Sequence, residues 1–220
     1  MDKMCDIEGL SPALLQTLPE LPLDLFPLPL SAFEKYLIWD ETPEQPMNSF
    51  IELHFLQPLQ VQVMESALNL AARIHPMLNC TIGDQEGHLC WEYHPEFRHR
   101  LECETQFPVL RRGRPVAIDL TSHPGIRFWY RQSAETGSAV LDRPSESSRV
   151  LIQLHHATSD GVGLRRFLID AMTIYAHCTS PESVDSGLRP PWNKLDAGLL
   201  KRRADFSDTF GGPPSQPLNF

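Results

Sequence analysis

The chain has 220 residues, enough for one large domain or two small ones, and 41% of them are hydrophobic, which is typical of a soluble globular protein. Its formal net charge is −9. Because nucleic acids and anionic membranes require a basic binding face, this charge argues against both as partners.

The sequence also shows no membrane span, no secretory signal and no paired cysteines. No apolar run is long enough to span a bilayer, and the first residues lack the apolar core of a secretory signal. The five cysteines are scattered and form no Cys-x-x-Cys pair. We therefore expect reduced thiols in a cytoplasmic protein.

The first expected segment, residues 1–30, is a proline-rich lead-in without a helix, because proline interrupts helical hydrogen bonding. A helix is predicted to start after Ser31, which suits an N-cap, since Glu34 follows at the spacing of a capping box. We place the main folded unit at residues 31–180.

Alternation of apolar and polar residues over 49–56 predicts a half-buried strand. Apolar residues at helical spacing over 63–74 predict a helix that Pro76 ends. Strands are expected at 77–83 and 88–94, joined by a turn between Gly83 and Gly87.

The second half of the main unit reads as a strand at 125–132, a surface loop over 133–148, a strand at 149–156 and a helix at 161–177. The proline-rich composition of residues 181–220 predicts a linker or tail. This order of elements predicts an α/β or α+β fold with a mixed β-sheet covered by helices.

Two adjacent histidines stand where the strand at 149–156 meets the next helix. Strand alternation points His155 and His156 to opposite faces, which disfavours a shared metal ion. A histidine at a strand end can act as a general base near neutral pH. Asp160 suits an N-cap of the helix, and Gly161 leaves room beside it. An ordinary polar junction between strand and helix is the simpler alternative.

The segment His-His-Ala-Thr-Ser-Asp-Gly at 155–161 resembles the His-His-x-x-x-Asp-Gly signature of the chloramphenicol acetyltransferase-like superfamily. That superfamily includes the condensation domains of nonribosomal peptide synthetases, the plant BAHD acyltransferases and the wax ester synthases. Upstream, Arg73, His75, Pro76 and Leu78 are similar to the Arg-x-His-Pro-x-Leu stretch in the N-terminal lobe of condensation-type domains. The resemblance covers residues 25–178.

This resemblance implies a two-layer sandwich lobe in which His156 is the general base that activates the acceptor. Asp160 would be structural, and His155 and Gly161 would shape the loop. The acyl donor would be a thioester of coenzyme A or of a phosphopantetheine arm, and the acceptor an alcohol or amine. No metal and no tightly bound cofactor are implied. The basic cluster at 201–203 could meet phosphates of such a donor, although solvated surface is the simpler interpretation.

The chain departs from the two-lobed members of the superfamily, because the Asp-Phe-Gly-Trp-like motif of a second lobe is absent. Three explanations follow from this. The chain is a fragment of a two-lobed enzyme, or it forms a homo-oligomer or pairs with a second lobe to complete the cleft, or it is an inactive, non-catalytic interaction module of the same fold.

Overall fold

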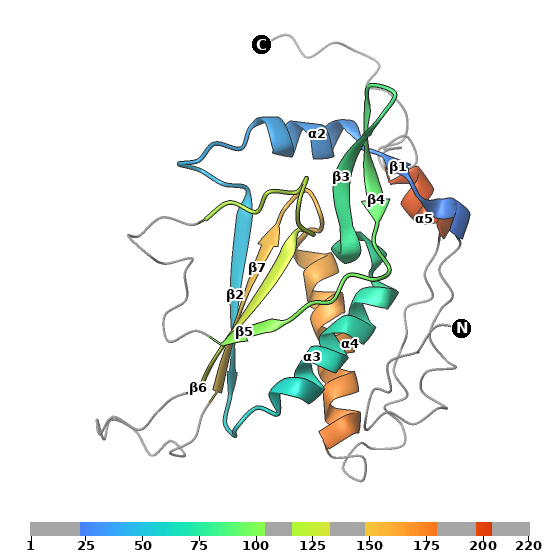
Figure 1. Cartoon of the computed structure of the whole chain (residues 1–220). Helices are drawn as coiled ribbons and strands as arrows, with labels where there is room; N and C mark the ends of the chain where they lie inside the picture. The colour runs from blue at the N-terminus through green and yellow to red at the C-terminus, as the bar shows by residue number, and fades with distance from the viewer. Residues whose placement is uncertain (1–22, 104–115, 133–147, 180–196, 204–220) are drawn as a thin grey trace, which may run out of the picture.

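The computed structural model describes residues 23–103, 116–132, 148–179 and 197–203 (Figure 1). Most of the expected lead-in, the expected loop after residue 132 and most of the expected tail lie outside these residues. Helices and strands follow in the order η1 (Leu23–Leu25), β1 (Leu28–Pro29), α2 (Ala32–Trp39), β2 (Asn48–Phe55), α3 (Val61–Ile74), η2 (Pro76–Asn79), β3 (Cys80–Gln85), β4 (His88–Tyr93), β5 (Leu101–Cys103), β6 (Ile126–Gln132), β7 (Ser148–His155), α4 (Gly161–Thr179) and α5 (Ala197–Arg202).

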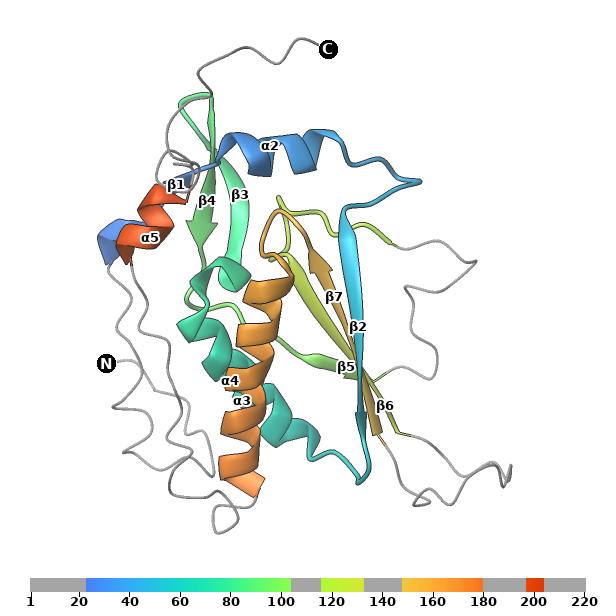
Figure 2. The same cartoon turned by 180° about the vertical axis from the view of Figure 1, so that it is seen from behind.

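The larger sheet has the strand order β2-β7-β6-β5. β7 pairs antiparallel with β2 and β6, and β5 pairs parallel with β6, so the sheet is mixed. Helices α3 and α4 lie side by side next to this sheet (Figures 1 and 2). A smaller antiparallel sheet has the order β1-β4-β3. The chain therefore has the predicted α+β fold, with a mixed sheet covered by helices.

The main core lies between the larger sheet and its two helices. The core-facing side chains of β7 are Val150, Ile152 and Leu154, and each is at most 2% exposed. Small buried alanines on both helices, such as Ala71 and Ala171, allow the helices to approach closely. Within the described residues, no helix combines the length and apolar character needed to cross a membrane.

A second core lies against the smaller sheet. It includes Leu25, Leu28 and Leu30, which fall within the expected lead-in and yet are buried against Trp91. Part of the expected tail also packs on this region, because Leu200 contacts the same cluster. The bounds at 30 and 180 stay predictions, but the packed structure extends beyond both.

Local signals placed several element ends, but the hairpin of β3 and β4 differs from the prediction. β3 runs through Gly83 to Gln85, so the turn is confined to Glu86 and Gly87. Ser31 Oγ accepts the Glu34 N–H at 3.2 Å and Glu34 Oε2 accepts the Ser31 N–H at 2.7 Å, which confirms the capping box. The strand expected at 77–83 begins only at Cys80. The preceding residues form a 3₁₀ turn, because the fixed φ of Pro76 suits the first position of a helical turn.

Candidate active site

The loop from His155 to Gly161 joins β7 to α4 at the end of the larger sheet nearest α2 (Figures 1 and 2). Neighbouring segments on both sides hold the main chain of the two histidines. The His155 N–H donates to the Gly125 carbonyl beside β6, and the His156 N–H donates to the Met47 carbonyl beside β2, each at 2.8 Å. Both backbone positions are therefore fixed by the sheet.

The two imidazoles occupy opposite environments. The His155 side chain is 0% exposed, whereas His156 is exposed to solvent. The predicted alternation is thus confirmed, and the rings do not converge on one point. Among the described residues, no group of three or more histidine, cysteine, aspartate or glutamate side chains is arranged to hold a metal ion.

His155 is held as a neutral ring. Its Nδ1 accepts the Ala157 N–H at 3.0 Å, so the ring proton is on Nε2, which donates to Glu41 Oε2 at 3.2 Å. Burial lowers the pKa of His155 below its ordinary value, an effect that Glu41 partly opposes. This ring is thus buried and hydrogen-bonded to the loop main chain and to Glu41.

His156 has a single side-chain partner among the described residues, the hydroxyl of Ser49 in β2. Ser49 Oγ lies 2.8 Å from His156 Nε2. Because the imidazole is exposed and its main chain is fixed, it can accept a proton from a group that arrives from solvent.

Asp160 caps helix α4, as the sequence predicted. Its Oδ1 accepts the Gly163 N–H at 2.7 Å and its carbonyl accepts the Leu164 N–H at 2.9 Å. A Cβ added at Gly161 would meet no atom within 4 Å, and its backbone is outside the left-handed region. The open space beside Gly161 therefore leaves room for another group, whereas the turn itself does not require glycine.

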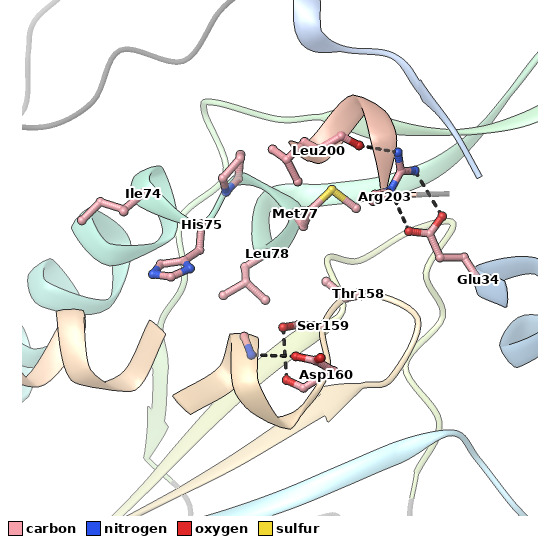
Figure 3. A pocket seen from close by; sticks show the side chains of 12 residues that line it. Glu34, Ile74, His75, Met77, Leu78, Thr158, Ser159, Asp160, Leu200 and Arg203 are labelled. Atoms are coloured by element: carbon pink, nitrogen blue, oxygen red, sulfur yellow. Dashed lines mark hydrogen bonds and ion pairs between the residues drawn. The ribbon is translucent and has the colours of Figure 1, made fainter. Parts of the chain in front are cut away.

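A cavity of about 300 Å³ opens on the α4 side of the loop (Figure 3). Its wall combines the segment Ile74–Leu78 with Thr158–Asp160, so the two stretches that carried the family resemblance meet here. His75, at the end of α3, is held by Asp170 of α4 through a 2.7 Å contact between Nε2 and Oδ2. His156 is not part of this wall.

Three contributors to the site region were missed by sequence reasoning. Glu41 lies in an irregular segment that carries no periodic signal. Ser49 could have been noticed, because it is the polar end of an apolar alternation. Arg203 was interpreted as solvated surface, but it is half-buried and forms a bidentate pair with Glu34, with distances of 2.9 and 3.1 Å.

Comparisons with known proteins give matches in structure alone. No protein family model matches the sequence, and no curated protein matches it. The X-domain solved in complex with OxyB from teicoplanin biosynthesis has a TM-score of 0.55 and 19% identity, over 71% of this chain and 33% of that one.

Two further solved structures show the same likeness. The cyclization-docking bidomain of the nonribosomal peptide synthetase EpoB from Sorangium cellulosum has a TM-score of 0.54 and 14% identity, over 88% of this chain and 43% of that one. The starter condensation domain of rhizomide synthetase RzmA has a TM-score of 0.51 and 16% identity, over 69% of this chain and 38% of that one.

These identities are low, so the likeness concerns the fold. The chain spans between a third and a half of the length of these solved structures. The chain therefore has a fold similar to part of these condensation-type and X-domain structures, which is the fold that the sequence resemblance implied.

Proposed function

We propose that this chain is an acyltransferase or condensation-type lobe in which His156 is the general base. The observation that carries the proposal is the exposed imidazole of His156, whose main chain is fixed at the end of β7 and whose Nε2 lies 2.8 Å from the Ser49 hydroxyl. The likeness of the fold to a condensation domain supports it, since the sequence motif of this chain lies at the junction of β7 and α4.

In the proposed reaction, His156 removes a proton from an alcohol or amine as that group attacks the carbonyl carbon of a thioester. The tetrahedral adduct then collapses, the C–S bond breaks, and the imidazolium returns its proton to the leaving thiolate. The donor in this proposal is an acyl-coenzyme A or a phosphopantetheinyl thioester, and no tightly bound cofactor takes part.

The partners and location belong to the same proposal. A second lobe or another copy of the chain would complete the cleft, because this chain covers only part of the length of the similar structures. The free thiols of Cys80, Cys90 and Cys178 agree with a reducing compartment such as the cytoplasm.

The experiment measures thiol release from acyl-coenzyme A by the full chain, with a panel of alcohols and amines as acceptors. We expect His156→Ala to abolish release above background. His88→Ala, which removes an exposed histidine of the hairpin between β3 and β4, should leave it unchanged. Equal activity of wild type and His156→Ala across the panel would contradict the catalytic proposal.

A non-catalytic interaction module is the second candidate, and an exposed aromatic stripe on α2 favours it. Phe33, Tyr36 and Trp39 are 56%, 54% and 73% exposed, which is unusual for such large side chains. The similar X-domain was solved in complex with another protein, OxyB. This candidate predicts no thiol release together with a stable complex, which native mass measurements would detect.

A further inference from the structure

Ser49 and His156 form a hydroxyl–imidazole pair at the edge of the main core. Ser49 Oγ lies 2.8 Å from His156 Nε2, within hydrogen-bonding distance. Ser49 is half-buried in β2, and the ring of His156 is exposed. An acyl donor can therefore approach the pair from solvent.

Sheet register explains why the two side chains meet. Ser49 is the Cα partner of Leu154, so it shares a sheet face with Leu154 and with His156, two residues further along. On β2 this face continues from Ser49 into apolar residues, beginning with Ile51, and on β7 it runs back from Leu154 to Val150. The core-facing residues of both strands are therefore apolar within the core, and each row ends in one polar residue, Ser49 on the β2 side and His156 on the β7 side.

A neutral imidazole can accept a proton from only one group at a time, which limits the groups that His156 can activate. A neutral imidazole has one nitrogen that accepts a proton, with a single lone pair. In the tautomer whose lone pair is on Nε2, the hydroxyl of Ser49 faces that lone pair at 2.8 Å, so an acceptor hydroxyl would have to displace it. A serine hydroxyl at this distance from an imidazole is also the arrangement of an activated nucleophile and its base.

We propose that Ser49 is itself the first acyl acceptor, so that transfer proceeds through an acyl-serine intermediate. His156 Nε2 takes the Ser49 hydroxyl proton as Oγ attacks the carbonyl carbon of an acyl thioester or an activated aryl ester. Collapse of the adduct breaks the bond to the leaving group, which receives the proton from the imidazolium. The products are O-acyl-Ser49 and a free thiol or phenol.

The second half of the cycle restores the serine. His156 removes a proton from an alcohol, amine or water as that group attacks the acyl-serine carbonyl, and the proton then passes to the departing Ser49 Oγ. This inference rests on the proposed role of His156 as a base. It adds a covalent step, and therefore ping-pong kinetics with an initial burst.

The experiment treats the full chain with p-nitrophenyl acetate and, separately, with acetyl-coenzyme A, and needs no knowledge of the acceptor. We expect a burst of p-nitrophenol close to the protein concentration, and one added acetyl group in the intact mass that peptide mapping places on Ser49. Ser49→Ala and His156→Ala should lose both signals. Ser122→Ala, which removes an exposed serine in a surface turn, should keep them.

Ser49→Cys guards against a folding defect in the alanine variant, because it retains a nucleophile and should accumulate an S-acetyl adduct. If the wild type transfers acyl groups to acceptors without an adduct, and Ser49→Ala is equally active, the covalent step is overturned and the proposed function stands. An acetyl-Ser49 without transfer to any acceptor would support the covalent step and contradict the transferase function. The absence of both adduct and transfer would overturn both.

Discussion

At the scale of single residues, Glu41 connects the segment after α2 to both histidines of the motif. Glu41 Oε1 accepts the Met47 N–H at 3.1 Å, and Oε2 accepts the proton of His155 Nε2 at 3.2 Å. The Met47 carbonyl in turn accepts the His156 N–H. One carboxylate thus contacts the buried ring of His155 and, through Met47, helps to hold the main chain of His156.

Replacement of Glu41 by alanine should destabilise the protein, because it leaves the Nε2–H of buried His155 without an acceptor. We expect Glu41→Ala to lower the free energy of unfolding by about 1–3 kcal/mol. Glu41→Gln, which keeps one acceptor oxygen, should lose less. Glu44→Ala is the matched control, since Glu44 is exposed in the same segment. Urea denaturation measures all three, and similar midpoints for Glu41→Ala and Glu44→Ala would contradict this role.

At the scale of elements, the start of α4 depends on the side chain of Asp160. An alanine there removes the acceptor for the Gly163 N–H, whereas asparagine retains an oxygen at the same place. We expect Asp160→Ala to cost about 1 kcal/mol of stability and Asp160→Asn to cost little. Thermal unfolding measures both variants. If thiol release by Asp160→Asn fell as far as that of His156→Ala, Asp160 would have a chemical role beyond capping.

The contact between α5 and the start of α2 depends on Arg203. Besides its pair with Glu34, Arg203 donates through Nη2 to the Pro29 carbonyl at 2.6 Å and through Nη1 to the Leu200 carbonyl at 3.1 Å. The two paired side chains are 17% and 12% exposed, so solvent screens them only partly.

Arg203→Ala should therefore weaken the docking of α5 by roughly 1–3 kcal/mol, the range for hydrogen bonds to charged groups. Hydrogen exchange of the α5 amides measures this directly, and faster exchange is expected. Arg202→Ala, at the exposed neighbouring position, should leave exchange unchanged. Equal exchange in the two variants would show that the pair with Glu34 does not hold the helix.

At the scale of the whole molecule, acid should destabilise the fold through His99. This side chain is buried between Asn79, whose Oδ1 lies 2.7 Å from its Nε2, and the ring of Phe128. Burial lowers the pKa of His99 from 6.5 to about 4, and His123 adds to the effect. Because the unfolded chain binds the proton more readily, stability is fully present above pH 6.5 and is lost as the pH falls towards 4.

The loss attributable to His99 is at most about 3.5 kcal/mol, since one pKa unit corresponds to about 1.4 kcal/mol. His99→Gln removes the titration, so its unfolding free energy should differ less between pH 7 and pH 5 than that of the wild type. The lowered pKa of His155 contributes in the same direction, so some pH dependence remains. His88→Gln, at an exposed site, should keep the wild-type pH dependence.

The fold was largely readable from local patterns, whereas the site was readable only in part. Alternation in β2, the apolar run of β7 and the capping box at Ser31 are properties of neighbouring residues, and all three were predicted. The capping role of Asp160 and the opposite directions of the histidines followed from the same local geometry. Contacts such as that of Glu41 with His155, 114 residues apart, depend on how the sheet assembles, so no local pattern indicates them.

The opposite orientation of the two histidines has a consequence for how the chain tolerates sequence change. Substitutions at position 155 must fit a closed, hydrogen-bonded space, so a screen for soluble folded protein should remove most of them. The adjacent exposed position should accept nearly any side chain in that screen and be restricted only when survival depends on catalysis. Mutational tolerance should thus change abruptly between two consecutive codons, and a library at these codons would separate the demands of folding from those of chemistry.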